Sequence, residues 1–200
     1  MVCARAIRLL SGLTLFALGT VIIIRADLGP LPWDVLHVAV AGRLGIPLGP
    51  VVALTGLATA GVASALGAPV GRWTVVNAIA GGALIQGWFA TGLFADVDRL
   101  AVLTRMLVVG VGVGVLALGV AIYLAAGLGS GPRDALMIAV AGTGGLGWGC
   151  ARAAVEGGAA VAGVALGGRF GAGTVLGVAL VGPALAWALR MTNDLRLDLN

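Results

Sequence analysis

Residues 28–36 read LGPLPWDVL and residues 128–136 read LGSGPRDAL, so the pattern LGxxPxDxL occurs twice. Each copy follows a long apolar run and precedes a much shorter one. Gly/Pro interruptions at corresponding places in the two halves of a membrane protein are the best indication, from sequence, of a binding site. We call the two copies the first break and the second break, and we expect them to decide the fold.

The similarity between the halves extends beyond the two breaks. Aligned without gaps, residues 18–42 and 118–142 are identical at thirteen of twenty-five positions, where about three identities are expected by chance. We therefore predict an internal duplication. Residues 1–100 form the first membrane repeat and residues 101–200 the second, within one integrated membrane domain.

The composition of the chain is that of a membrane protein. Hydrophobic residues make up 60% of the sequence, charged residues only 10%, and the mean hydropathy is +1.11, whereas a soluble domain has about 25% charged residues. All twelve basic residues are arginines, and they lie scattered between apolar runs. This distribution is typical of the flanks of membrane spans and not of a nucleic-acid-binding surface. We expect a lipid bilayer as the surroundings and no nucleic acid as a partner.

The residue types needed for most enzyme chemistry are missing. Cys3, Cys150 and His37 are the only cysteines and histidine, so no disulfide framework, metal cluster or Cys/His catalytic pair can form. There is no lysine for a phosphate-binding loop, and no Ser/His/Asp or paired-glutamate arrangement. We predict no enzyme activity, no metal and no cofactor.

The lengths of the apolar runs predict the membrane topology. Residues 7–24, 51–68 and 73–94 are each long enough to cross a hydrocarbon core of about 30 Å. Residues 32–44 cover only roughly 20 Å as a helix, which is too short to cross. We favour an all-α protein with three full spans and one short re-entrant helix per repeat, which makes the repeats inverted. The alternative is eight spans in two parallel repeats; both place the N- and C-termini in the cytoplasm by the positive-inside rule.

Several of these segments also resemble a known family. Residues 26–36 (ADLGPLPWDVL), residues 171–174 (GAGT) and the following Gly182-Pro183 are similar to the YczE/YitT-like family of small bacterial integral membrane proteins. The resemblance covers nearly the whole chain. It implies a multi-pass protein of the bacterial cytoplasmic membrane with no well-defined biochemical activity. The first half departs from the pattern at residues 71–74, which read GRWT.

The two breaks supply the main candidates for a site. Asp34 and Asp134 each come two residues after a proline, in the first turn of the short helix, where a carboxylate caps free N–H groups. Such a structural role is the simpler interpretation, but an ionisable group at membrane depth is also a functional candidate. If the breaks face each other, their carboxylates and carbonyls line one pseudo-symmetric site that favours a cation or a neutral polar solute. The candidates in the breaks are Gly29, Pro32, Asp34, Gly129, Pro132 and Asp134.

Arg152 and Glu156 are the next candidates, because they lie four residues apart and share one helix face. The first half has no equivalent, since Val52 and Gly56 occupy the corresponding positions. A structural ion pair is the simpler interpretation. The functional one is that the pair reaches the substrate site and exchanges partners as a solute or proton passes.

His37 lies one turn after Asp34 on the same helix face, which is compatible with a proton relay. Met137 replaces it in the second half, so we favour an interfacial histidine at the membrane surface. Arg133 is interpreted as a boundary charge. The other secondary candidates lie at helix starts and are expected to form caps or interhelical hydrogen bonds: Thr74, Asn77 and Thr174.

The thirty-five glycines predict close helix packing, because small residues four apart let helix backbones approach each other in lipid. Three such pairs are Gly110/Gly114, Gly163/Gly167 and Gly173/Gly177. We predict a small transporter or permease of the bacterial inner membrane that moves an unidentified small polar or cationic solute past the two breaks. The alternative is a non-transporting scaffold or accessory subunit that binds a protein partner or a second copy of the chain through its glycine-rich faces.

Overall fold

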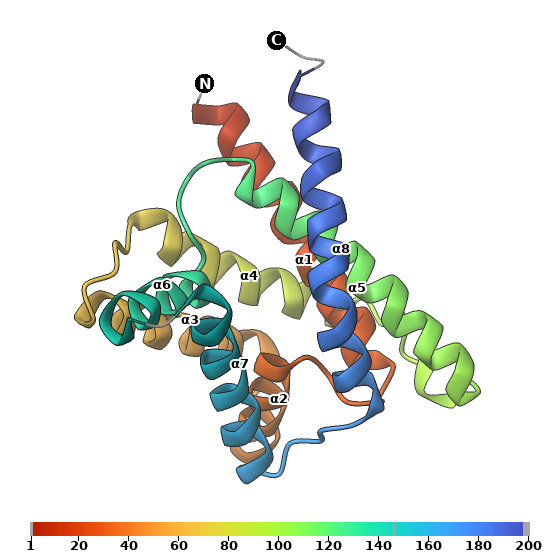
Figure 1. The fold of residues 1–200 in the computed structure, drawn as a ribbon. Helices are drawn as coiled ribbons and strands as arrows, with labels where there is room; N and C mark the ends of the chain where they lie inside the picture. The colour runs from red at the N-terminus through yellow and green to blue at the C-terminus, as the bar shows by residue number, and fades with distance from the viewer. Residues whose placement is uncertain (1, 146, 198–200) are drawn as a thin grey trace. The chain divides into compact units, whose positions relative to one another are not determined.

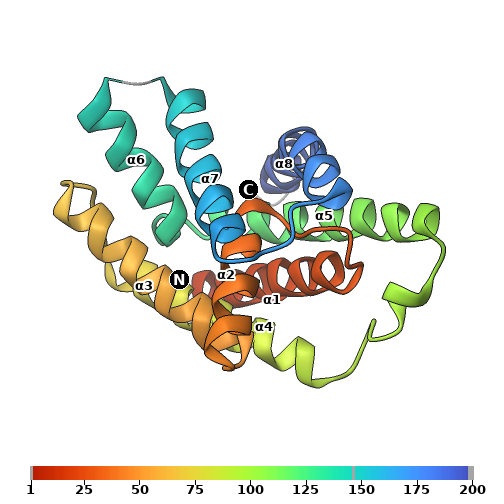
Figure 2. The same ribbon diagram turned by 90° about the horizontal axis from the view of Figure 1, so that it is seen from below.

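The computed structural model describes residues 2–145 and 147–197, which form eight α-helices, one short 3₁₀ helix and no strand (Figures 1 and 2). The all-α prediction is therefore confirmed. The helices of the first half are α1 (Val2–Arg25), α2 (Pro32–Leu44), α3 (Leu48–Ala65) and α4 (Arg72–Ala90). After the 3₁₀ helix Val97–Arg99 come α5 (Val102–Leu124), α6 (Pro132–Gly144), α7 (Trp148–Ala165) and α8 (Ala172–Leu197).

The two breaks determine where the short helices begin. Both α2 and α6 start at the proline of the LGxxPxDxL pattern and are 13 residues long, because proline fixes a helical φ and needs no hydrogen-bond partner at the first helical position. All four helices of the second half begin one hundred residues after their counterparts in the first half.

Among the described residues, four helices are long and apolar enough to cross a membrane: α1, α3, α5 and α8. The helices α4 and α7, with 19 and 18 residues, are long enough but less apolar. Large apolar side chains are exposed on these helices; on α5, Leu103, Leu107 and Val111 are 71%, 66% and 61% exposed. Such a surface is favourable against lipid and unfavourable against water. The chain is thus a membrane protein in contact with the bilayer.

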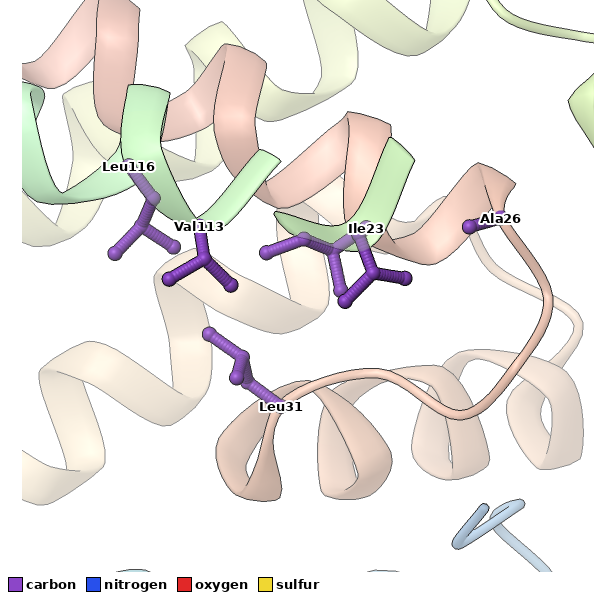
Figure 3. Close-up of a cluster of buried hydrophobic side chains, with 6 residues drawn as sticks. Ile23, Ala26, Leu31, Val113 and Leu116 are labelled. Atoms are coloured by element: carbon purple, nitrogen blue, oxygen red, sulfur yellow. The ribbon is translucent and has the colours of Figure 1, made fainter. Parts of the chain in front are cut away.

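The described helices group into two compact units, each built from both halves of the sequence. Residues 1–31, 87–128 and 170–200 belong to the first unit, in which α5 packs against both α1 and α8. Its core is a cluster of apolar side chains in which Leu31, just before α2, points toward Val113 and Leu116 of α5 (Figure 3). The cluster consists of Ile23, Ala26, Leu31, Val109, Val113 and Leu116.

Four glycines form the crossing between α1 and α5. Gly12 lies against Gly119, and Gly19 lies against Gly112, so closely that a Cβ at any of the four would collide with the facing helix. Because the earlier glycine of α1 faces the later glycine of α5, the two helices run in opposite directions, as Figures 1 and 2 also show.

Residues 32–86 and 129–169 form the second unit, in which α2 packs against α7 and α6 packs against α3. The contact of α2 depends on Gly163 and Gly168, where a Cβ would collide with the backbone at Val35 and Leu36. Of the predicted four-residue pairs, Gly163 and Gly173 lie against backbone and Gly177 lies against the Leu31 side chain. A Cβ at Gly114 or Gly167 would meet nothing within 4 Å.

Candidate functional site

A buried cluster of charged and aromatic side chains lies at the starts of α2 and α6, within the second unit. Asp34 is 2% exposed, and its Oδ1 lies 3.1 Å from Nδ1 of His37 and 3.6 Å from a terminal guanidinium nitrogen of Arg133. The guanidinium carbon of Arg133 lies 5.2 Å from the ring centroid of Trp33. One carboxylate of the first break is therefore paired with a cation of the second break.

The surroundings of Asp134 differ from those of Asp34. Its carboxylate lies next to Gly131, and its side chain is only partly buried. The buried position that His37 takes in the first half is filled by Met137. The two aspartates thus occupy the first turns of equivalent helices in unequal environments.

The first break makes a close backbone contact with the start of α8, within the first unit. The Gly173 N–H donates to the Leu28 carbonyl oxygen at 2.7 Å. A Cβ on Gly29, which has φ +95°, would collide with Gly171 and Thr174. The hydroxyl oxygen of Thr174 accepts a hydrogen bond from the Gly171 N–H at 3.2 Å, as predicted for a capping residue.

The second break makes its contact with the start of α4, within the second unit. Thr74 Oγ1 donates to the Ser130 carbonyl oxygen at 3.0 Å, and the threonine is 2% exposed. The bond joins the start of α4 to the non-helical segment before α6 and not to another helix. Each break thus contacts the fourth helix of the other half, but through a different kind of bond.

Arg152 and Glu156 form the predicted ion pair on α7, with Arg152 Nε 2.9 Å from Glu156 Oε1. Their side chains are 36% and 23% exposed. Within the part of the chain that the structure describes, no hydrogen bond or ion pair joins this pair to Asp34, and no cluster of three His, Cys, Asp or Glu side chains is placed to hold a metal.

Two residues of the cluster have roles that sequence reasoning missed. Arg133 was expected as a boundary charge, but it lies beside Asp34 and Trp33. His37 was interpreted as an interfacial histidine, and its contact with Asp34 inside the protein, where it is 2% exposed, was not expected. One available signal was that Arg133 occupies the position of Trp33 in the repeated pattern, so that the variable residues of the two breaks are complementary to each other.

Comparison with known proteins gives a family without an assigned activity. Residues 3–190 match the family of unknown function DUF6198. An uncharacterised protein of Haemophilus influenzae is 31% identical over 183 residues, covering 92% of this chain and 82% of that protein. The uncharacterised membrane protein YczE of Bacillus subtilis is 30% identical over 188 residues, covering 90% of this chain and 82% of YczE. No solved structure matches the chain.

Proposed function

The chain belongs to the YczE-like family of unknown function DUF6198, and we propose that it is a small transporter of the bacterial inner membrane that moves a small polar or cationic solute. Its repeats are residues 1–100 and 101–200, inverted with respect to each other, and its solute site lies at the two breaks. No enzyme chemistry is part of this proposal.

The antiparallel packing of α1 and α5 is the observation that carries the proposal. Both helices are long and apolar enough to span the membrane, and the facing of Gly12 with Gly119 and of Gly19 with Gly112 sets their opposite directions. In parallel repeats, equivalent helices would cross in the same direction. Opposite directions support inverted repeats, the arrangement on which many secondary transporters are built.

The charged cluster supports placing the site at the breaks. Ionisable side chains at membrane depth are costly and usually mark the path of a solute or proton. Asp34, His37 and Arg133 lie together at the starts of two short helices that follow Gly/Pro breaks. Interrupted helices of this kind surround the substrate in secondary transporters.

The topology can be tested by cysteine accessibility. In a variant with Cys3→Ala and Cys150→Ala, a single cysteine at position 98 is expected to react with an impermeant thiol reagent in intact cells. Three crossings from a cytoplasmic N-terminus bring this linker to the outer face. Reaction only after the membrane is opened would contradict the inverted arrangement.

Equivalent loops provide a matched control for this experiment. In inverted repeats, Pro69→Cys and Arg169→Cys, each introduced alone into the same background, lie on opposite faces of the membrane. We expect the cysteine at position 169 to be labelled from outside and the one at position 69 only in opened cells. Labelling of both from the same side would favour parallel repeats.

Transport itself is tested with purified protein in liposomes on a solid-supported membrane. A panel of small organic cations is applied as concentration jumps, and neutral polar solutes are followed by isotope uptake. We expect a current or an uptake that is saturable and is lost in Asp34→Asn. If no solute moves and a protein partner co-purifies in a fixed ratio in mild detergent, the chain is the scaffold or accessory subunit of the alternative hypothesis.

A further inference from the structure

The cluster at the starts of α2 and α6 has the components of a site for an organic cation. Asp34 supplies a buried carboxylate, and Trp33 supplies an aromatic face beside it. A carboxylate combined with an aromatic face attracts guanidinium and ammonium groups, the ring acting on cations within about 6 Å of its centroid. In this conformation the cation between them is the protein's own Arg133.

The contact between Arg133 and this carboxylate is long. Its nitrogen lies 3.6 Å from Asp34 Oδ1, whereas a charge-assisted N–H···O⁻ hydrogen bond is about 2.7–2.9 Å long. The residue is the second of α6, where the positive end of the helix dipole disfavours a cation. Its side chain is 28% exposed, compared with 3% for the Asp34 side chain. A small free cation can therefore make a closer contact with Asp34 than Arg133 does.

One polar atom of the cluster, in the Trp33 side chain, is left unsatisfied. The Nε1 atom of Trp33 is buried and, among the described residues, has no hydrogen-bond partner, and the residue is 8% exposed. An unsatisfied buried donor costs about 1–3 kcal/mol. A ligand that carries an acceptor atom beside its cationic group would remove this cost and leave Asp34 paired.

We propose that Asp34 and Trp33 bind a small organic cation of the guanidinium class, and that Arg133 occupies the place of this ligand when the site is empty. The inference deepens the function proposed above and rests on it in treating the ligand as the transported solute. Arg133 must move aside when the ligand enters. It therefore acts as an internal competitor that lowers the apparent affinity.

Binding is measured on the full chain in detergent by scintillation proximity with ¹⁴C-labelled guanidinium. We expect saturable binding that unlabelled methylguanidinium and acetylguanidinium displace and that urea, the neutral isostere of guanidinium, does not. Acetylguanidinium is expected to displace the label at lower concentration than methylguanidinium, because its carbonyl oxygen can accept the Trp33 Nε1–H. If urea or acetate displaces the labelled guanidinium at the same concentration as methylguanidinium does, the assignment of a cation is overturned.

The variants test each component of the site. Arg133→Ala is expected to lower the Kd for guanidinium by about tenfold, because it removes the competitor that keeps the binding-competent state rare. Asp34→Asn is expected to abolish binding. Arg43→Ala, which removes a guanidinium from the last turn of the same helix α2, is the matched control and is expected to leave the Kd unchanged.

Two further results would overturn the inference: no binding in either the native chain or Arg133→Ala, or equal binding in Asp34→Asn. If Asp34→Asn does not fold, Trp33→Ala replaces it, with binding weakened by about tenfold expected from the lost ring and donor. Binding without flux in liposomes would contradict only the proposed transport. Flux of other solutes without guanidinium binding would contradict only the inference.

Discussion

The first and second breaks share one sequence pattern but differ in the surroundings of their aspartates. Asp34 is buried and paired with His37 and Arg133, whereas Asp134 is partly exposed beside Gly131. The pattern Gly-x-x-Pro-x-Asp gives both segments a turn followed by a short helix. The residues at its variable positions then decide which carboxylate is buried.

The glycines of the two breaks differ in the same way. Gly29 and Gly129 both have positive φ, +95° and +120°, but only Gly29 lies against other backbone. A Cβ at Gly129 would meet nothing within 4 Å, whereas one at Gly29 would collide with Gly171. The first break is therefore fixed by close packing and the second by the Thr74 hydroxyl, so segments with the same pattern are held by different contacts.

The largest difference in the free energy of unfolding is expected between variants that remove one or the other of the two carboxylates. Asp34→Asn leaves His37 and Arg133 without their anion, and breaking such a buried pair costs about 3–5 kcal/mol. Asp134→Asn is expected to cost about 1 kcal/mol or less, because partly exposed pairs contribute little. Unfolding by SDS in mixed micelles, followed by circular dichroism, measures both. Equal losses would mean that burial does not distinguish the two aspartates.

A smaller difference is expected from the glycines. Gly29→Ala combines a strained backbone with a collision, and we expect a loss of about 3 kcal/mol. Gly129→Ala meets only the backbone strain and should cost about 1 kcal/mol. The same unfolding titration tests the pair. A larger loss of unfolding free energy for Gly129→Ala than for Gly29→Ala would show that the close contact with α8 is not what holds the first break in place.

The smallest effect is expected at the hydroxyl that holds the second break. Thr74→Val keeps the shape of the side chain but removes the hydrogen bond to the Ser130 carbonyl, with an expected loss of about 1 kcal/mol. Thr74→Ser keeps the hydroxyl and should restore most of this loss. Hydrogen exchange of the amides after residue 130 should increase in Thr74→Val alone. Unchanged hydrogen exchange would show that the Thr74 hydroxyl does not hold the second break in place.

Local sequence signals predicted much of the fold. The prolines at 32 and 132 located the starts of both short helices, because proline is favoured at the first helical position. The four-residue spacing of Arg152 and Glu156 predicted their ion pair, because these positions are neighbours on any helix. Both predictions depend only on the geometry within one helix, which follows from the spacing of residues in the sequence.

Contacts between distant segments were not predictable in the same way. No local pattern links Arg133 to Asp34, since 99 residues separate them. The burial of His37 likewise depends on which other segments pack over it. The α1–α5 crossing was missed for a different reason. A spacing of four residues does not include Gly12 and Gly19, which are seven apart. Their recurrence as Gly112 and Gly119 was the available signal.

This quartet of glycines makes the α1–α5 contact self-complementary. Exchanging the two helices maps Gly12 onto Gly112 and Gly19 onto Gly119, so the contact has the two-fold character of an isologous dimer interface within one chain. The same two glycine positions occur in both halves. A polypeptide consisting of one half alone therefore carries both sides of this joint and can form it only with an oppositely oriented copy of itself.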